Sequence, residues 1–161
     1  MANLPQLLEE DISGLNDTLH GLLIKSEASA ALLIDKGGFL ITTTGEVEGL
    51  DTVTLSALAA ASFAATQGLA SLVGETNFST VYQQGENNSL LVVNVDASCL
   101  LTVVFKATIA VGAVKYYAER SIDGIAAHSA SARSTSRSLG APKLVPSPTA
   151  SRMAFTTSGC A

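Results

Sequence analysis

The 161-residue sequence is poor in charge, in aromatic residues and in cysteine. Charged residues make up 14% of the chain, well below the usual quarter, and tryptophan is absent. The two cysteines, Cys99 and Cys160, lie in different contexts and do not suggest a disulfide framework, so a reducing cytoplasm is the expected location. Low charge beside 47% hydrophobic residues indicates that a partner covers part of the surface.

The basic residues are too few and too scattered for a nucleic-acid-binding protein. Residues 1–129 hold all 14 acidic residues and five basic ones, a net charge of −9, whereas residues 130–161 carry +4. Phosphate recognition needs clustered Lys and Arg, so nucleic acid is excluded as the main partner. We expect no membrane partner either, because no apolar run near 18 residues is evident and the N-terminus lacks the features of a secretory signal.

Motifs for chemistry are also missing. The sequence has no P-loop, and neither His20 nor His128 has a second His or Cys at metal-ligand spacing. We therefore predict no catalytic residues, no metal and no cofactor. Glu46 and Glu48 are candidates to face a basic surface of a partner, with an ordinary solvated loop as the alternative.

Residues 51–76 carry the longest helical pattern, and the other elements are arranged around it. Asp51 is suited to cap the helix, because its carboxylate can accept a hydrogen bond from a free first-turn amide. Gly74 is suited to end it, and no charged residue lies between Asp51 and Glu75. The three- and four-residue spacing predicts one buried stripe of mostly larger residues: Leu55, Leu58, Ser62, Leu69, Leu72 and Val73.

A second stripe on this helix consists only of small residues. Its members are Ala57, Ala61, Ala64, Gly68 and Ser71. Small side chains let another backbone approach closely, and two interpretations stay open. The helix is either central and buried on both sides within one chain, or it packs this stripe against a copy of itself or a partner protein. The second is favoured because a domain of this size has few elements with which to cover both faces.

The whole pattern predicts an α+β fold with the element order α-β-β-α-β-β-β-α. We expect one five-stranded antiparallel sheet, with the long middle helix on one face and the terminal helices on the other. From about Ser129 the periodicity ends, so residues 1–129 are predicted to form the domain and residues 130–161 a disordered Ser/Pro-rich tail. The predicted helices are 4–26, 51–76 and one starting at Thr108, and the predicted strands are 29–35, 39–43, 79–84, 89–95 and 99–105.

The hairpin ALLIDKGGFLITTTG, followed by DTVTLSALAAASFAATQGLASLVGE, resembles the Roadblock/LC7 family, and within it the bacterial MglB-type branch. The resemblance covers roughly residues 5–127, in the correct element order. It implies a roadblock, profilin-like fold and dimers in which the middle helices pack side by side and the sheets can join through the third strand. The implied interface residues are Ala57, Ala61, Ala64, Gly68 and Ser71 in the helix, and Thr80 and Tyr82 in the strand.

The resemblance also implies a function as a platform for small Ras-like GTPases, whose hydrolysis of GTP the MglB-type members stimulate. No arginine occurs in residues 1–119, so the middle helices cannot supply an arginine finger. We expect a homodimeric, non-catalytic regulator, either GTPase-activating or a scaffold, that acts through the residues of the GTPase. The alternatives are a small-molecule or metabolite-sensing domain, which the lack of tryptophan and of inward polar groups disfavours, and a structural scaffold with a non-GTPase partner.

Overall fold

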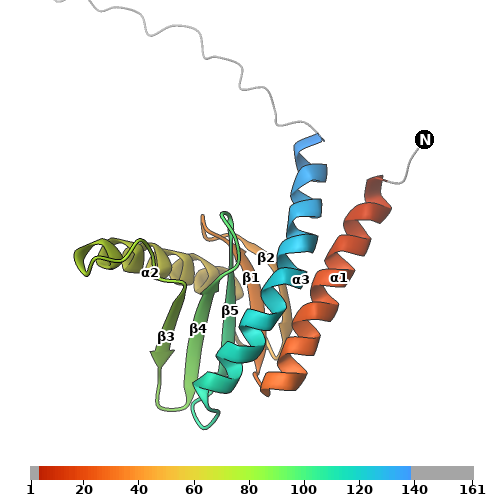
Figure 1. Cartoon of the computed structure of the whole chain (residues 1–161). Helices are drawn as coiled ribbons and strands as arrows, with labels where there is room; N and C mark the ends of the chain where they lie inside the picture. Colours follow the sequence, from red (N-terminus) through yellow and green to blue (C-terminus); the bar gives the residue numbers. More distant parts are fainter. Residues whose placement is uncertain (1–3, 139–161) are drawn as a thin grey trace, which may run out of the picture.

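The computed structural model describes residues 4–138, whose helices and strands follow the predicted order (Figure 1). All strand pairs are antiparallel, and the single sheet has the order β2-β1-β5-β4-β3, which leaves β2 and β3 at its edges. The predicted α+β class is therefore confirmed. The elements are α1 (Leu4–Ser26), β1 (Ala30–Asp35), β2 (Leu40–Gly45), α2 (Thr52–Leu72), β3 (Thr80–Gln84), β4 (Asn88–Asn94), β5 (Cys99–Lys106) and α3 (Val111–Ser138).

The first hairpin closes through the predicted glycine turn. The amide of Asp35 donates to the carbonyl of Phe39 at 2.8 Å, and the amide of Gly38 donates to the carbonyl of Asp35 at the same distance. Gly38 has a φ of +94°, which glycine adopts without the steric penalty of a Cβ. The segment Lys36–Gly38 is thus a hairpin turn.

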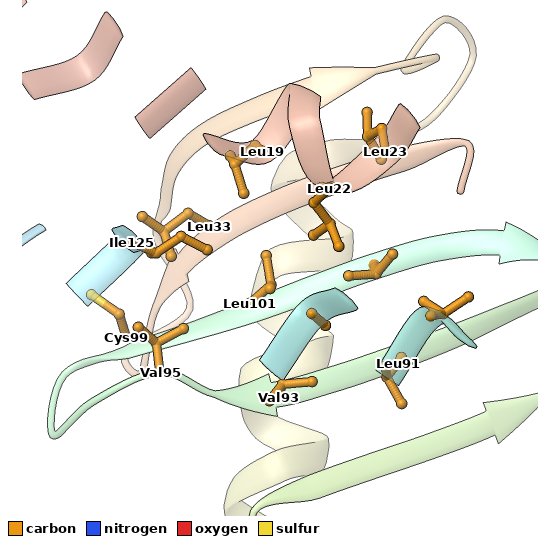
Figure 2. Packing of buried hydrophobic residues seen from close by; sticks show 14 of the residues in the cluster. Leu19, Leu22, Leu23, Leu33, Leu91, Val93, Val95, Cys99, Leu101 and Ile125 are labelled. Carbon is orange, nitrogen blue, oxygen red and sulfur yellow. The ribbon is translucent and has the colours of Figure 1, made fainter. Parts of the chain in front are cut away.

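Helices cover both faces of the sheet, so the chain has two hydrophobic cores (Figure 1). Figure 2 shows the core under α1 and α3, where Leu19, Leu22 and Ile125 meet strand residues such as Leu33 and Leu101. The core under α2 uses the intervening strand positions, because successive side chains of a strand point to opposite faces. It contains Ala30, Leu32, Ile34, Ala59, Ala60, Phe63, Val92 and Leu100.

The terminal helices α1 and α3 run side by side in opposite directions (Figure 1). At their contact, a Cβ on Gly14 would come within 2.7 Å of the His128 ring, so only glycine at this position avoids a steric clash with the imidazole. Leu15 and Leu19 of α1 are buried, whereas Ile12 is 40% exposed.

Helix α3 is longer than its hydrophobic pattern indicates. It begins at Val111 rather than Thr108 and continues to Ser138, past the predicted boundary at residue 129. The loss of periodicity in the sequence therefore does not mark the end of the helix. Residues 130–138, predicted as part of the tail, are helical, and the prediction for residues 139–161 lies outside the described part of the chain.

Candidate functional site: the outer face of helix α2

Both ends of α2 form as the sequence predicts. Asp51 caps the N-terminus: its Oδ1 accepts the Thr54 amide at 3.0 Å and its Oδ2 accepts the Thr54 hydroxyl at 2.6 Å. The hydroxyl bond and then the amide bond stabilise the carboxylate and lower the pKa of Asp51 from its usual value. At the C-terminus Gly74 has a φ of +81°, and the amide of Glu75 reaches back to the carbonyl of Ala70 at 2.9 Å. This Schellman arrangement ends the helix.

The face of α2 that packs on the sheet is not the predicted one. The buried residues are Ser56, Ala59, Ala60, Phe63 and Ala70. The predicted buried stripe is wrong, because four of its six members are exposed: Leu58 by 63%, Leu69 by 55%, Leu72 by 80% and Val73 by 68%. The physical reason is that alanines let the helix lie close to the sheet, where Phe63 and the partly buried Leu55 are the larger α2 side chains in the core.

The small-residue stripe lies on the exposed side. Its members Ala57, Ala61, Ala64, Gly68 and Ser71 are all solvent-exposed in the single chain. A Cβ on Gly68 would meet nothing within 4 Å, so no contact within the described chain requires glycine there. Glycine inside a helix costs roughly 1 kcal/mol relative to alanine, which fits a position kept free for the close approach of another backbone.

Exposed leucines border this stripe. Leu58, Leu69 and Leu72 each directly follow a stripe member and therefore lie about 100° around the helix from it. We call the stripe and these three leucines together the outer face of α2. Sequence reasoning missed the leucines because it assigned them to the core, although their position beside the small residues was readable from the spacing.

Strand β3 is an edge of the sheet, but its two predicted interface side chains point away from α2. Thr80 and Tyr82 pair with Val93 and Leu91, which belong to the core under α1 and α3, and the Tyr82 ring stacks on Phe105 at 6.2 Å. The structure thus places these two side chains on the sheet face opposite the outer face of α2, and their role in an interface stays a prediction. The backbone edge of β3 can pair with another strand.

Charge is absent from α2 itself and sparse around it. The acidic candidates Glu46 and Glu48 are exposed in the segment between β2 and α2, close in sequence to the start of the helix. Neither makes a salt bridge with the side chains described in residues 9–129, where the ion pair between Lys115 and Glu119 is the one that forms, at 3.7 Å. The outer face is therefore an apolar surface with acidic residues in the preceding loop.

Helix α2 is also long and apolar enough, by length and composition, to cross a membrane. The sequence argument that no such stretch exists is therefore wrong. The core helix of a soluble protein passes the same test. Here α2 lies along the sheet with Ala59, Ala60 and Phe63 buried, so packing accounts for the apolar residues on that side.

A cavity of about 290 Å³ opens between the second half of α2 and the sheet. Phe63 and Gln67 of α2 form its roof, and Asn94 and Leu100, which pair across β4 and β5, form its floor. Lys36 from the first hairpin also lines it. Sequence reasoning did not bring these residues together, because they come from four separate elements.

The described residues contain no cluster of three or more His, Cys, Asp or Glu that could hold a metal. His20 is exposed on α1, and His128 packs against Gly14 between α1 and α3. Cys99 is buried on β5. What the geometry does offer is a surface for protein contact and the small cavity under α2.

Comparison with known proteins identifies the Roadblock/LC7 domain. The sequence model for the Roadblock/LC7 domain matches residues 15–105. MglB from Myxococcus xanthus is 31% identical with a TM-score of 0.65, covering 69% of this chain and 90% of that chain. MglB from Thermus thermophilus, a gliding protein, is 32% identical with a TM-score of 0.68, covering 73% and 90%.

A third similar structure is described as MglB with a tetrameric arrangement. It is 31% identical with a TM-score of 0.68, and the match covers 80% of this chain and 92% of that chain. A comparison with curated protein sequences gives no match.

Proposed function

This chain belongs to the Roadblock/LC7 family, and on that premise we propose that it is a dimeric, non-catalytic regulator of a small Ras-like GTPase. Its architecture is the roadblock, profilin-like fold that the sequence predicts. The similar MglB structures support a regulatory function rather than an enzymatic one. The cytoplasm is the proposed location, since two cysteines in unrelated parts of the sequence do not suggest a disulfide framework.

The observation that carries the proposal is the outer face of α2. Leu58, Leu69 and Leu72 are each more than half exposed in the single chain, beside a line of alanines and Gly68. Leaving such a continuous apolar strip in water is unfavourable, and covering it with a second copy of the same helix removes both strips at once. The small stripe allows the two backbones to approach closely, and the leucines fill the sides of the contact.

The free edge of β3 supports a second contact in the same dimer. Because Thr80 and Tyr82 point to the face away from α2, pairing there would use the amides and carbonyls of the edge rather than these side chains. A sheet continued from one protomer into the other would then lie beneath the paired α2 helices.

The GTPase would dock on the paired helices and be activated through its own residues. Arg120 is the first arginine of the chain, and its guanidinium lies 5.5 Å from the ring centre of Tyr116 on α3, across the sheet from α2. An arginine finger from the proposed platform is therefore excluded, and stimulation would come from ordering the catalytic groups of the GTPase. Glu46 and Glu48 are placed to meet a basic surface of that partner.

The experiment is the stoichiometry of the complex with a Ras-like GTPase from the same genome, loaded with GTP or GDP, by size exclusion with light scattering. A GTP-dependent complex of two copies with one GTPase is expected, and single-turnover hydrolysis then separates activation from scaffolding. Variants in which Glu46 and Glu48 are changed to glutamine, compared with the wild type in the same assay, test whether these carboxylates contribute to GTPase binding. A monomer at micromolar concentration would remove the main support. A dimer that binds neither nucleotide form would favour a scaffold for a different partner.

A further inference from the structure

The cavity between α2 and the sheet has a charged rim and an apolar interior. Lys36 is exposed, and its backbone amide donates to the carbonyl of Ser98 at 2.8 Å, which fixes the hairpin at the cavity. Inside, the lining includes the buried Phe63 and Leu100 together with Phe78 from the segment between α2 and β3. A cationic rim above aromatic and aliphatic walls suits a ligand with one anionic end and an apolar body.

The charge balance at the rim favours a single negative charge. No acidic residue lines the cavity, and Lys36 makes no ion pair with any residue of the described chain. The other polar groups of the lining are the amides of Gln67, Asn77 and Asn94. One ammonium group matches a monocarboxylate, whereas a dianionic phosphate is usually held by several cations or by a helix N-terminus.

Asn94 supplies the second specific feature. Its side-chain Oδ1 is buried and has no hydrogen-bond partner among the described residues, although its backbone amide donates to the carbonyl of Ser79 at 2.9 Å. A buried acceptor without a partner is unfavourable, so a ligand that brings an N–H or O–H donor to it gains affinity.

The roof of the cavity is held in place by a hydrogen bond. The Gln67 side-chain amide donates to the carbonyl of Phe78 at 3.0 Å and ties the segment after α2 to the helix. The volume, about 290 Å³, is at the lower end for small-molecule sites, so the ligand is smaller than a typical drug. The site is thus largely formed before a ligand arrives.

We propose that this cavity binds a small organic monocarboxylate whose carboxylate meets Lys36, whose ring or chain packs on Phe63 and Phe78, and whose N–H or O–H donates to Asn94. Ala64 belongs both to the cavity lining and to the small-residue stripe of α2. A bound ligand therefore lies directly beside the proposed dimer and GTPase surface. The binding itself requires neither partner and is tested without them.

The probe is hippurate, which carries a carboxylate, an amide N–H and a benzene ring. It is titrated into the full-length, 15N-labelled protein while the side-chain amide signals of Asn94 and Gln67 are followed by NMR. We expect saturable shifts of these two signals. Neutral hippuramide and phenyl phosphate should each bind at least about tenfold more weakly, because the first lacks the charge and the second carries a charge that one lysine does not match.

Variants locate the site. Lys36→Gln should weaken hippurate binding about tenfold or more, and Asn94→Leu should do the same because it removes the acceptor for the ligand N–H. The matched controls Lys25→Gln and Asn88→Leu change exposed residues outside the cavity and should leave the affinity unchanged.

Several results would overturn the proposal. They are the absence of saturable shifts at millimolar hippurate, equal binding of hippuramide, tighter binding of phenyl phosphate, or full affinity in Lys36→Gln. Binding that appears only after the dimer is dissociated would mean that a second copy fills the cavity, and this too would contradict a preformed ligand site.

Discussion

Replacing Leu69 with alanine tests whether the outer face of α2 is buried between two copies. The side chain is 55% exposed in the single chain. Burying a leucine completely contributes roughly 1.5–3 kcal/mol, so covering the exposed part contributes about 0.8–1.7 kcal/mol per chain. A symmetric dimer loses this contribution twice. Because alanine retains the Cβ, we expect the dissociation constant of the dimer to rise about 10- to 100-fold.

Sedimentation velocity over a dilution series measures this constant directly. Ile24→Ala is the matched control, because Ile24 is 67% exposed but lies on α1, on the other side of the sheet. Its dimer constant should equal that of the wild type. If Leu69→Ala dimerised as tightly as Ile24→Ala, the outer face of α2 would not be the interface, and the reasoning from its exposed leucines would fail.

Three further predictions concern single residues. Gly45→Ala should lower the free energy of unfolding, measured in urea, by about 3 kcal/mol, because φ is +103° and a Cβ would overlap the Ser29 carbonyl oxygen. The control Gly49→Ala, where φ is +75° and the space is open, should lower it by only about 1 kcal/mol. Equal losses in the two variants would contradict this reasoning. The pKa of Asp51 in the folded protein is lowered from 3.8, so its carboxylate stabilises the fold fully above that value and this stabilisation is lost as the pH falls through the folded pKa. The difference in free energy of unfolding between the wild type and Asp51→Ala should therefore become smaller in acid. A difference that does not change with pH would argue against the charged cap. Arg120→Ala should leave single-turnover GTP hydrolysis by the partner unchanged while binding persists, and lost hydrolysis with intact binding would reveal an arginine finger after all.

Much of the fold was predictable because several local signals agree. The runs around Leu91 and Leu101 are apolar enough to be central strands, and the pair Gly37-Gly38 marks a tight turn between two strand-like segments. Asp51 and Gly74 delimit α2 through capping chemistry that depends only on neighbouring residues. Features set by local geometry were therefore recovered almost to the residue.

The orientation of α2 was not predictable by the same reasoning. The helix has no charged residue on any side, so periodicity does not show clearly which line of side chains faces the sheet. The choice depends on how closely the helix approaches the sheet, and this distance favours Ala59 and Ala60 over Leu58 and Leu69. The end of α3 was also not predicted, because the apolar periodicity of the sequence ends near Ser129 while the helix continues to Ser138.

The candidate site was half predictable for a related reason. The small-residue stripe follows from the spacing within one helix, and its five members do lie together on the exposed side of α2. Its role as an interface stays a prediction. Thr80 and Tyr82 were proposed for the interface because they lie in the third strand. The alternation of side chains along that strand, which places both on the sheet face away from α2, was not considered. The cavity joins Lys36 to Asn94, and such a meeting of distant segments follows only from the tertiary structure.

The pairing of β1 with β5 has a consequence for how the chain folds. Every other strand pair joins sequence neighbours through a hairpin, but here residue 35 lies opposite residue 99, with α2 and three strands (β2, β3 and β4) between them. Closing so long a loop lowers the conformational entropy of the chain before the contact between β1 and β5 can stabilise the fold. The segment up to β2 and the segment from β3 onward can form their hairpins independently, so the slow event is the docking of these two halves along β1 and β5. Helix α2 is the linker between the halves, and it gains its place on the sheet only when that central seam has closed.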